Sequence, residues 1–401
     1  MDRTTSAARR LGTLGLTTLI FSTLPGCGGN PPQKIDDVRV KQFAGRGYLT
    51  DDRYSIATTF ANWNLGEHSL DVAWTVPVTG NALPMVIYLP GLGESRTAGD
   101  AWRTAWAQAG YAVLSVQLLE DDQKAWSSAA AKRGDFDGLA RQRYGMEAAG
   151  ARMQALAALL GRLQGVGTDT PLLRRLDLSR IAVAGFDLGA YTSMLVAGEA
   201  PKFGGEPVLL PIPVSAVIAL SPFADFSGSG LSTRYQSITM PVLSVSSDTD
   251  SDAAGVVTSP SLRRAPFQYM PSKDAYLLWL ADAGHSVFSG SVQAAPDETA
   301  RAGPNEDGQP ARHNGRHRDS NGYGGTREQD SGFGGPMPGA QVLSPTDRAI
   351  DVSLIQGVTT AFLDAYLKHD PTAQEWLRKD ARRWVGQRGD LMRKKGQASP
   401  T

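Results

Sequence analysis

Cysteine is almost absent from this chain of 401 residues, in which Cys27 is the single example. One thiol excludes intramolecular disulfides, so an apolar core must hold the fold together. Hydrophobic residues make up 41% of the chain, which is enough for such a core. Charge of one sign is also lacking, because 40 basic residues balance 40 acidic ones, and this balance gives no indication of nucleic-acid binding. Histidine is scarce, at five residues, which leaves few candidates for a general base.

The N-terminus has the pattern of an export signal. Arg9 and Arg10 precede an apolar run from Leu11 to Leu24 that is too short to span a membrane. The run leads through Pro25 and Gly26 into Cys27, and this segment resembles a bacterial lipoprotein signal, with an ordinary cleaved signal as the alternative. The resemblance implies that residues 1–27 are a signal peptide and that acyl chains on Cys27 anchor the protein to a membrane. We therefore expect a lipid-anchored protein of the cell envelope, outside the cytoplasmic membrane.

Apolar segments alternate with helical patterns along most of the chain. Continuous or alternating apolar runs predict strands within residues 69–78, 83–93, 111–119, 180–187, 215–222, 241–247 and 275–285. Helical patterns cover residues 95–110 and 144–163, and a charged loop lies before the second of these. Strands separated by helices predict an α/β fold with a mostly parallel, doubly wound sheet flanked by helices.

Composition also predicts the domain boundaries. Residues 28–68 are expected to form a tether and the first strands, residues 69–290 the core, and residues 346–385 two C-terminal helices, followed by a polar tail over 386–401. Residues 291–345 are rich in Gly and Pro and poor in aliphatic side chains, which predicts a disordered insertion. His313 and His317 lie in this insertion, and because their spacing would need a helix to bind a metal, we expect no metal site.

The stretch IAVAGFDLGAYTS, residues 181–193, predicts a strand, a tight turn and the start of a helix. The turn has the G-x-S-x-G form of a nucleophile elbow, with Asp187 where serine would stand. Gly185 and Gly189 flank it at the positions where a strained turn needs small residues. Asp187 is therefore a candidate nucleophile, and the alternative is an aspartate that only caps the helix.

Two later loops supply a candidate acid and a candidate base. His285 follows a predicted strand and is the best candidate for a general base, with a purely structural histidine as the alternative. The loop SDTDSD offers three aspartates to orient this histidine, of which we choose Asp250 over Asp248 and Asp252, although an acidic surface loop would have the same composition.

The order of nucleophile position, acid and histidine is the one that α/β-hydrolases use. Segments over residues 69–377, outside the insertion, resemble the dienelactone-hydrolase-like and platelet-activating-factor-acetylhydrolase-like α/β-hydrolases: PGLGESR, AWAQAGYAVLSVQ, RIAVAGFDLGAYTSMLVAG, IALSP, PVLSVSSDTD, YLLWLADAGHSVFSG and AFLDAYLKHDPTAQEWL. The resemblance implies the α/β-hydrolase fold and an oxyanion hole formed by the backbone N–H groups of Leu92 and Leu188. It also implies a small ester-like substrate or ligand and no cofactor.

Three functions remain open because Asp187 replaces the serine. The first is a hydrolase related to carboxylic ester hydrolases, with an atypical nucleophile. The second is a catalytically silent binding protein, in which His285 lies between Asp187 and Asp250 as a structural ion triad. The third is an aspartate-nucleophile hydrolase acting on an alkyl carbon, as haloalkane dehalogenases and epoxide hydrolases do, although residues 223–240 leave no space for the helical cap that follows the sixth strand in those enzymes. Attack by Ser193 is a further alternative.

Overall fold

The computed structural model describes residues 34–394 except for 51–52, 67, 166–169, 201–208, 227–229, 253–254, 256, 258, 297 and 299–341. The predicted signal peptide, Cys27 and most of the predicted insertion therefore lie outside the described residues.

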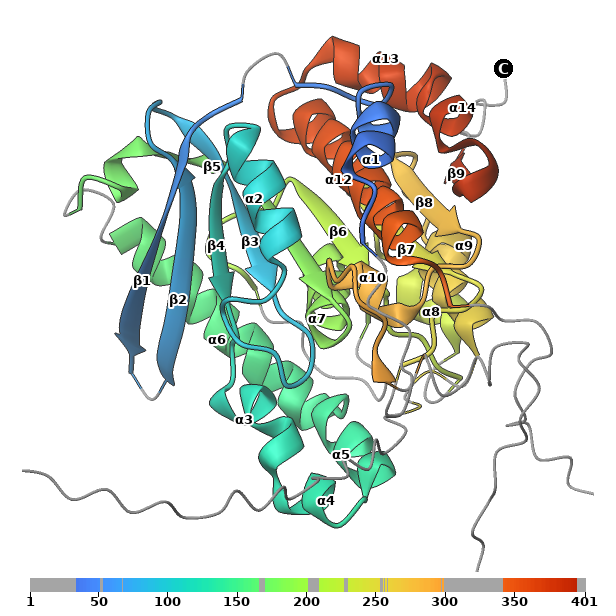
Figure 1. Ribbon diagram of the computed structural model, residues 1–401. Coiled ribbons are helices and arrows are strands. Elements are labelled where there is room, and N and C mark those ends of the chain that lie inside the picture. Colours follow the sequence, from blue (N-terminus) through green and yellow to red (C-terminus); the bar gives the residue numbers. More distant parts are fainter. Residues whose placement is uncertain are drawn as a thin grey trace, which may run out of the picture. The chain divides into compact units, whose positions relative to one another are not determined.

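A nine-stranded sheet forms the centre of the fold, with the strand order β1-β2-β4-β3-β5-β6-β7-β8-β9 (Figure 1). The strands from β4 through β3 to β8 pair in parallel, whereas β1–β2, β2–β4 and β8–β9 pair antiparallel. The strands are β1 Ile56–Leu65, β2 His68–Pro77, β3 Leu83–Leu89, β4 Ala112–Val116, β5 Leu176–Phe186, β6 Ala216–Leu220, β7 Val242–Ser247, β8 Ala275–Leu280 and β9 Gly389–Arg393.

Helices cover both faces of this sheet, which makes the chain an α/β protein (Figure 1). The helices with at least eight residues are α1 Asp37–Ala44, α2 Asp100–Gln108, α5 Phe136–Arg143, α6 Met146–Gly165, α7 Leu188–Ala197, α12 Pro345–Leu367 and α13 Pro371–Lys379. The shorter ones are α3 Glu120–Gln123, η1 Ala125–Ser127, α4 Ala129–Lys132, η2 Leu173–Arg175, α8 Leu231–Tyr235, η3 Pro260–Arg264, α9 Ala265–Tyr269, α10 His285–Phe288, α14 Ala381–Val385 and η4 Gly386–Arg388.

The side chains of β3 show why the sheet needs helices on both of its faces. All seven of its side chains are buried. Val86 and Tyr88 pack into the core that contains α2 and α12, while Met85 and Ile87 pack into the core that contains α6. Successive side chains of a strand point to opposite faces, so a continuous apolar strand must have a helical layer on each side.

The strand order also determines where a site can form. The chain continues from β3 to β4 on one side and then crosses to β5 on the other side of β3. The loops after β3 and β5 therefore separate at the carboxyl edge of the sheet, which is the usual position of ligand sites in such sheets. Leu92 follows β3 and Asp187 follows β5, so the topology brings these two predicted residues to the same place.

Two segments outside the predicted bounds of the core take part in the fold. The predicted polar tail contains β9, which pairs with β8 and buries Leu391. The beginning of the predicted insertion is also ordered, because Glu298 accepts a hydrogen bond from the Ser286 N–H (2.6 Å) and pairs with Arg348 of α12 (3.1 Å). The partners of β9 and of Glu298 are distant in sequence, so local composition does not reveal either contact.

Candidate active site

Asp187 occupies a strained turn between β5 and α7. Its backbone angles, φ 52° and ψ −110°, lie outside the regions that a non-glycine residue normally adopts. A Cβ on Gly185 would overlap the Gly189 backbone, and a Cβ on Gly189 would overlap the carbonyl of Leu89. The side chain of Asp187 makes no capping hydrogen bond to α7. The capping alternative is therefore wrong, and the carboxylate is available to the site.

Both carboxylate oxygens of Asp187 accept hydrogen bonds from neighbouring loops. Oδ2 accepts from the backbone N–H of Leu92 at 3.2 Å, and Oδ1 accepts from the Tyr144 hydroxyl at 2.5 Å. Leu188 begins α7 directly after Asp187, but no described hydrogen bond joins its N–H to the carboxylate. Of the two residues expected in an oxyanion hole, Leu92 is thus the one whose amide contacts the elbow side chain.

Tyr144 is a site residue that the sequence did not indicate. It lies between α5 and α6, is 3% exposed, and packs against Phe223 and Tyr191 with ring centroids 4.8 and 6.0 Å away. Burial, followed by the charge of Asp187 and the hydrogen bond to it, raises the pKa of Tyr144 well above its usual value. The hydroxyl therefore stays protonated and donates to Asp187.

The segment before Tyr144, residues 120–143, folds into α3, η1, α4 and α5. The three α-helices lie near the N-terminal end of α6 (Figure 1), and we call residues 120–143 the cover segment. The Trp126 indole N–H donates to the Leu92 carbonyl (3.1 Å), and the Gly93 N–H donates to the Asp122 carbonyl (2.8 Å). The Asp122 carboxylate is buried and pairs with Arg152 of α6 at 2.6 Å. A charged loop was expected here, but these contacts hold the loop that carries the Leu92 amide.

His285 and Asp250 form a hydrogen-bonded pair. Nδ1 of His285 lies 2.7 Å from Oδ1 of Asp250, which is fully buried, whereas the imidazole is 16% exposed. Asp248 is exposed, and Asp252 pairs with Arg263 at 3.2 Å. Of the three aspartates in this loop, Asp250 is the one that contacts the histidine. With Nδ1 bound in this way, no described residue hydrogen-bonds to the opposite nitrogen, Nε2, of His285.

The carboxylate of Asp250 is held ionised by three further groups. The hydroxyls of Ser221 and Ser246 donate to it at 2.9 and 2.7 Å, and Nε of Arg263 lies 3.4 Å away. Burial tends to raise the pKa of Asp250, but the charge of Arg263 and the hydrogen bond from His285 outweigh burial and lower it. Ser221 and Arg263 were not expected as site residues: Ser221 lies in the segment IALSP, but nothing in that segment indicates a bond to Asp250, and Arg263 belongs to none of the segments singled out in the sequence.

His285 does not bridge the two aspartates in the ion triad that was expected to support the silent interpretation. No hydrogen bond or ion pair joins Asp187 and His285, and the nearest ring nitrogen and carboxylate oxygen are more than 4.0 Å apart. Burial lowers the pKa of His285, but the hydrogen bond and charge of Asp250, together with the charge of Asp187, raise it overall. The two side chains thus interact through their charges without forming an ion triad.

The remaining candidates do not join the site. Ser193 is fully buried and donates to the Gly189 carbonyl at 2.8 Å, so it is not a nucleophile. His313 and His317 lie outside the described residues, and within the described part of the chain no group of three His, Cys, Asp or Glu side chains could hold a metal. None of the described helices has the length and apolar character needed to cross a membrane.

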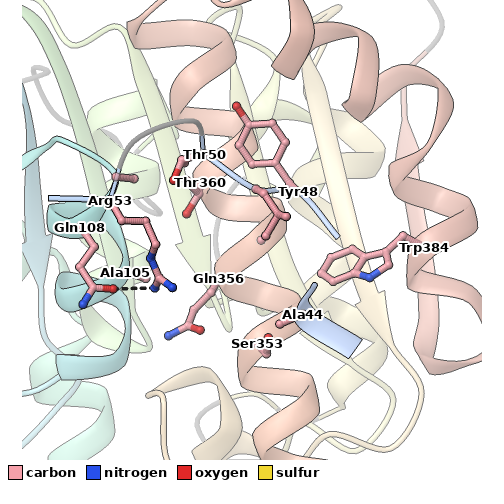
Figure 2. Close-up of a pocket in the computed structure, with 13 residues that line it drawn as sticks. Ala44, Tyr48, Thr50, Arg53, Ala105, Gln108, Ser353, Gln356, Thr360 and Trp384 are labelled. Carbon is pink, nitrogen blue, oxygen red and sulfur yellow. Dashed lines mark hydrogen bonds between the residues drawn. The ribbon is translucent and has the colours of Figure 1, made fainter. Parts of the chain in front are cut away.

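A pocket of about 160 Å³ lies elsewhere on the molecule, between α1, α2, α12 and α14 (Figure 2). Arg53 in this pocket donates to the side chain of Gln108 at 2.8 Å, and Tyr48, Gln356 and Trp384 also line it. None of the predicted site residues contributes to it.

The chain matches no protein-family model, and no curated protein matches it either.

Proposed function

We propose that this protein is an α/β-hydrolase-fold enzyme in which Asp187 attacks a saturated carbon and the His285–Asp250 pair activates the water that releases the product. The observation that carries the proposal is the position of the Asp187 carboxylate. Its Oδ2 accepts a hydrogen bond from the Leu92 N–H, while Nε2 of His285 has no hydrogen-bond partner among the described residues. The parallel strand order, with the elbow after β5, supports the proposed fold family.

Ester cleavage with Asp187 as the nucleophile is chemically unfavourable. A carboxylate that attacks an ester carbonyl must form a mixed anhydride while it expels an alkoxide, which is the poorer leaving group. The Leu92 amide, which would stabilise the oxyanion of an ester substrate, is also bound to Asp187. The geometry therefore favours the alkyl-carbon alternative over a carboxylic ester hydrolase.

The first step forms an ester between Asp187 and the substrate. A lone pair on Oδ1 attacks the carbon, the bond from that carbon to its leaving group breaks, and the leaving group takes the electron pair. Each carboxylate oxygen has two acceptor positions, so the hydrogen bond from Tyr144 orients Oδ1 and still leaves a lone pair for attack.

The second step hydrolyses this ester. Nε2 of His285 removes a proton from water, and the resulting hydroxide adds to the carboxyl carbon of Asp187, after which the product alcohol leaves with a proton from the imidazolium. Oδ2 carries the negative charge of the intermediate and is stabilised by the Leu92 N–H. Water activation needs a neutral imidazole, so the raised pKa of His285 predicts that this step accelerates as pH rises above 6.5.

A silent binding protein remains the second candidate, because Leu92 and Tyr144 hold both oxygens of Asp187 in one orientation. Turnover in H₂¹⁸O separates the two functions. The soluble protein is incubated with panels of epoxides and alkyl halides, and the peptide that contains Asp187 is then analysed by mass spectrometry. The enzyme incorporates ¹⁸O into Asp187 over repeated turnovers, and the Asp187→Ala variant forms no product. Absence of label and of product for both panels would support the silent function.

We also propose that lipid on Cys27 holds the enzyme at a membrane in the cell envelope, where its partners are the membrane and a small-molecule substrate. Buried acyl chains contribute about 0.8 kcal/mol per CH₂, so two or more chains give stable anchoring. Metabolic labelling with an alkyne fatty acid tests this proposal. Label should appear in the membrane fraction of the wild type and be lost in Cys27→Ala, whereas equal labelling of both would contradict it.

A further inference from the structure

Glu94 is a second acidic residue at this site, and the function proposed above does not use it. It lies two residues after Leu92 on the loop that follows β3. Its backbone N–H donates to the Gly91 carbonyl at 3.1 Å, and the Gln117 side chain donates to the carbonyls of both Gly91 (2.9 Å) and Glu94 (3.2 Å). The loop therefore holds Glu94 in a defined position relative to the Leu92 amide.

The carboxyl group of Glu94 has an amide partner but no cation. Oε2 accepts from the Gly91 N–H at 2.8 Å, and no described Lys or Arg forms an ion pair with Glu94 or with Asp187. Gly91 also contacts Phe186, because a Cβ on Gly91 would lie 2.8 Å from that ring. The Phe186 ring in turn packs on His285 with centroids 4.9 Å apart. Gly91 and Leu92 are consecutive, so the carboxyl groups of Glu94 and Asp187 accept from neighbouring backbone N–H groups and lie side by side at the elbow.

The surroundings of Glu94 favour its protonated form. Burial raises its pKa most, the Gly91 hydrogen bond lowers it, Asp187 raises it and His285 lowers it, which together give a pKa of about 7. The charge of Glu94 also acts on Tyr88 of β3, whose buried hydroxyl has no hydrogen-bond partner among the described residues: burial, followed by this charge, raises the pKa of Tyr88. A carboxyl group that is partly protonated at neutral pH is suited to donate a proton.

We propose that Glu94 is the general acid that protonates an oxygen leaving group, and that the substrate is therefore an epoxide and not an alkyl halide. This inference rests on the proposed nucleophilic role of Asp187. A halide leaves as an anion and needs cations or N–H donors around it, whereas no described Lys or Arg forms an ion pair with Asp187 or Glu94. Tyr144 is a weaker acid than Glu94, and its hydroxyl already donates to Asp187.

The proton balance closes within the site. Asp187 attacks one ring carbon, the carbon–oxygen bond of the epoxide breaks, and the oxygen takes the Glu94 proton, which leaves a hydroxyalkyl ester on Asp187 and a carboxylate on Glu94. Hydrolysis of this ester consumes one water and gives a diol and the neutral acid of Asp187. That acid returns a proton to Glu94, so the net reaction is epoxide plus water to diol.

The test measures formation of the Asp187 ester by rapid-quench mass spectrometry, with 4-nitrostyrene oxide and 1-bromohexane as probes. For the epoxide, the wild-type rate should fall as pH rises through about 7. Glu94→Gln should lower this rate about 10²–10⁴-fold and abolish the pH dependence, because general acid catalysis is lost. Glu94→Asp should recover part of the rate, and the remote, exposed Glu375→Gln should behave as wild type.

Three results would overturn the inference, and they are distinguishable. If Glu94→Gln forms the epoxide ester within about threefold of the wild-type rate and keeps the pH dependence, Glu94 is not the acid. If the wild type forms an ester with the bromide but not with the epoxide, the substrate class is wrong while the role of Asp187 stands. If neither probe gives an ester, the proposed function fails and this inference fails with it. Thermal unfolding of each variant checks that a decrease in the rate of ester formation does not result from unfolding of the protein.

Discussion

Replacement of Asp250 by Asn tests the electrostatic centre of the site. The buried carboxylate accepts hydrogen bonds from Ser221 and Ser246, contacts His285 at 2.7 Å and balances the buried charge of Arg263. Asparagine has nearly the same shape but no charge, so the buried Arg263 would lose one of its two carboxylate partners and keep only Asp252 at 3.2 Å. Removing one partner of a buried ion pair costs about 3–5 kcal/mol when the other charge is left uncompensated, and because Asp252 still pairs with Arg263 we expect a loss of unfolding free energy of about 3 kcal/mol.

The same substitution should lower the pKa of His285, because the hydrogen bond and charge of Asp250 raise it in the wild type. A histidine whose folded pKa exceeds its unfolded value of about 6.5 stabilises the fold fully below that pH, and the contribution is lost as pH rises through the folded pKa. Asp250 itself stays ionised in this range because its pKa is lowered. The stability difference between wild type and Asp250→Asn should therefore be larger at pH 5.5 than at pH 9.

Urea unfolding at both pH values, together with NMR titration of the His285 ring, measures these effects. Asp248→Asn is the matched control from the same loop, since its carboxylate is 64% exposed and lies 3.6 Å from Arg264. The control should change stability by less than about 0.5 kcal/mol. Equal effects of the two substitutions, or an unchanged His285 pKa in Asp250→Asn, would refute this account of the pair.

Three further predictions concern the elbow and the sheet. Asp187→Ser frees the Leu92 amide and should give p-nitrophenyl acetate hydrolysis that is lost in the double variant with His285→Ala; activity that survives that second change would count against the geometry. Gly189→Ala should lower the free energy of unfolding by more than about 3 kcal/mol, because the new Cβ would overlap the Leu89 carbonyl. Gly150→Ala on α6 is the control: its Cβ meets open space, so it should raise the free energy of unfolding by about 0.5–1 kcal/mol. Chemical unfolding measures both. Truncation after Arg388 removes β9 and exposes the edge of β8, so light scattering should detect aggregation that the full chain does not show.

The sheet and the elbow could be predicted because their signals are local. An apolar strand such as β3 is recognisable from its own residues, and the spacing of Gly185 and Gly189 reflects backbone overlaps within a few residues. Asp250 and His285 could be proposed because each follows a strand whose carboxyl end reaches the same edge of the sheet.

The rest of the site depends on contacts between distant segments. Tyr144 reaches Asp187 only because the cover segment folds against the Leu92 loop and is held by the buried Asp122–Arg152 pair. Glu94 looks like an ordinary loop acid until its burial is known. The ion triad was expected from charge alone, but the distance between His285 and Asp187 is determined by three separate loops.

The most direct test of the central claim is the mass of the peptide that contains Asp187 after the His285→Gln variant has reacted with 4-nitrostyrene oxide. This variant keeps the nucleophile but cannot activate water, so the ester should accumulate. The account predicts that the peptide gains the mass of the epoxide and that fragmentation places it on Asp187. An unmodified peptide, or an adduct on another residue, would contradict it.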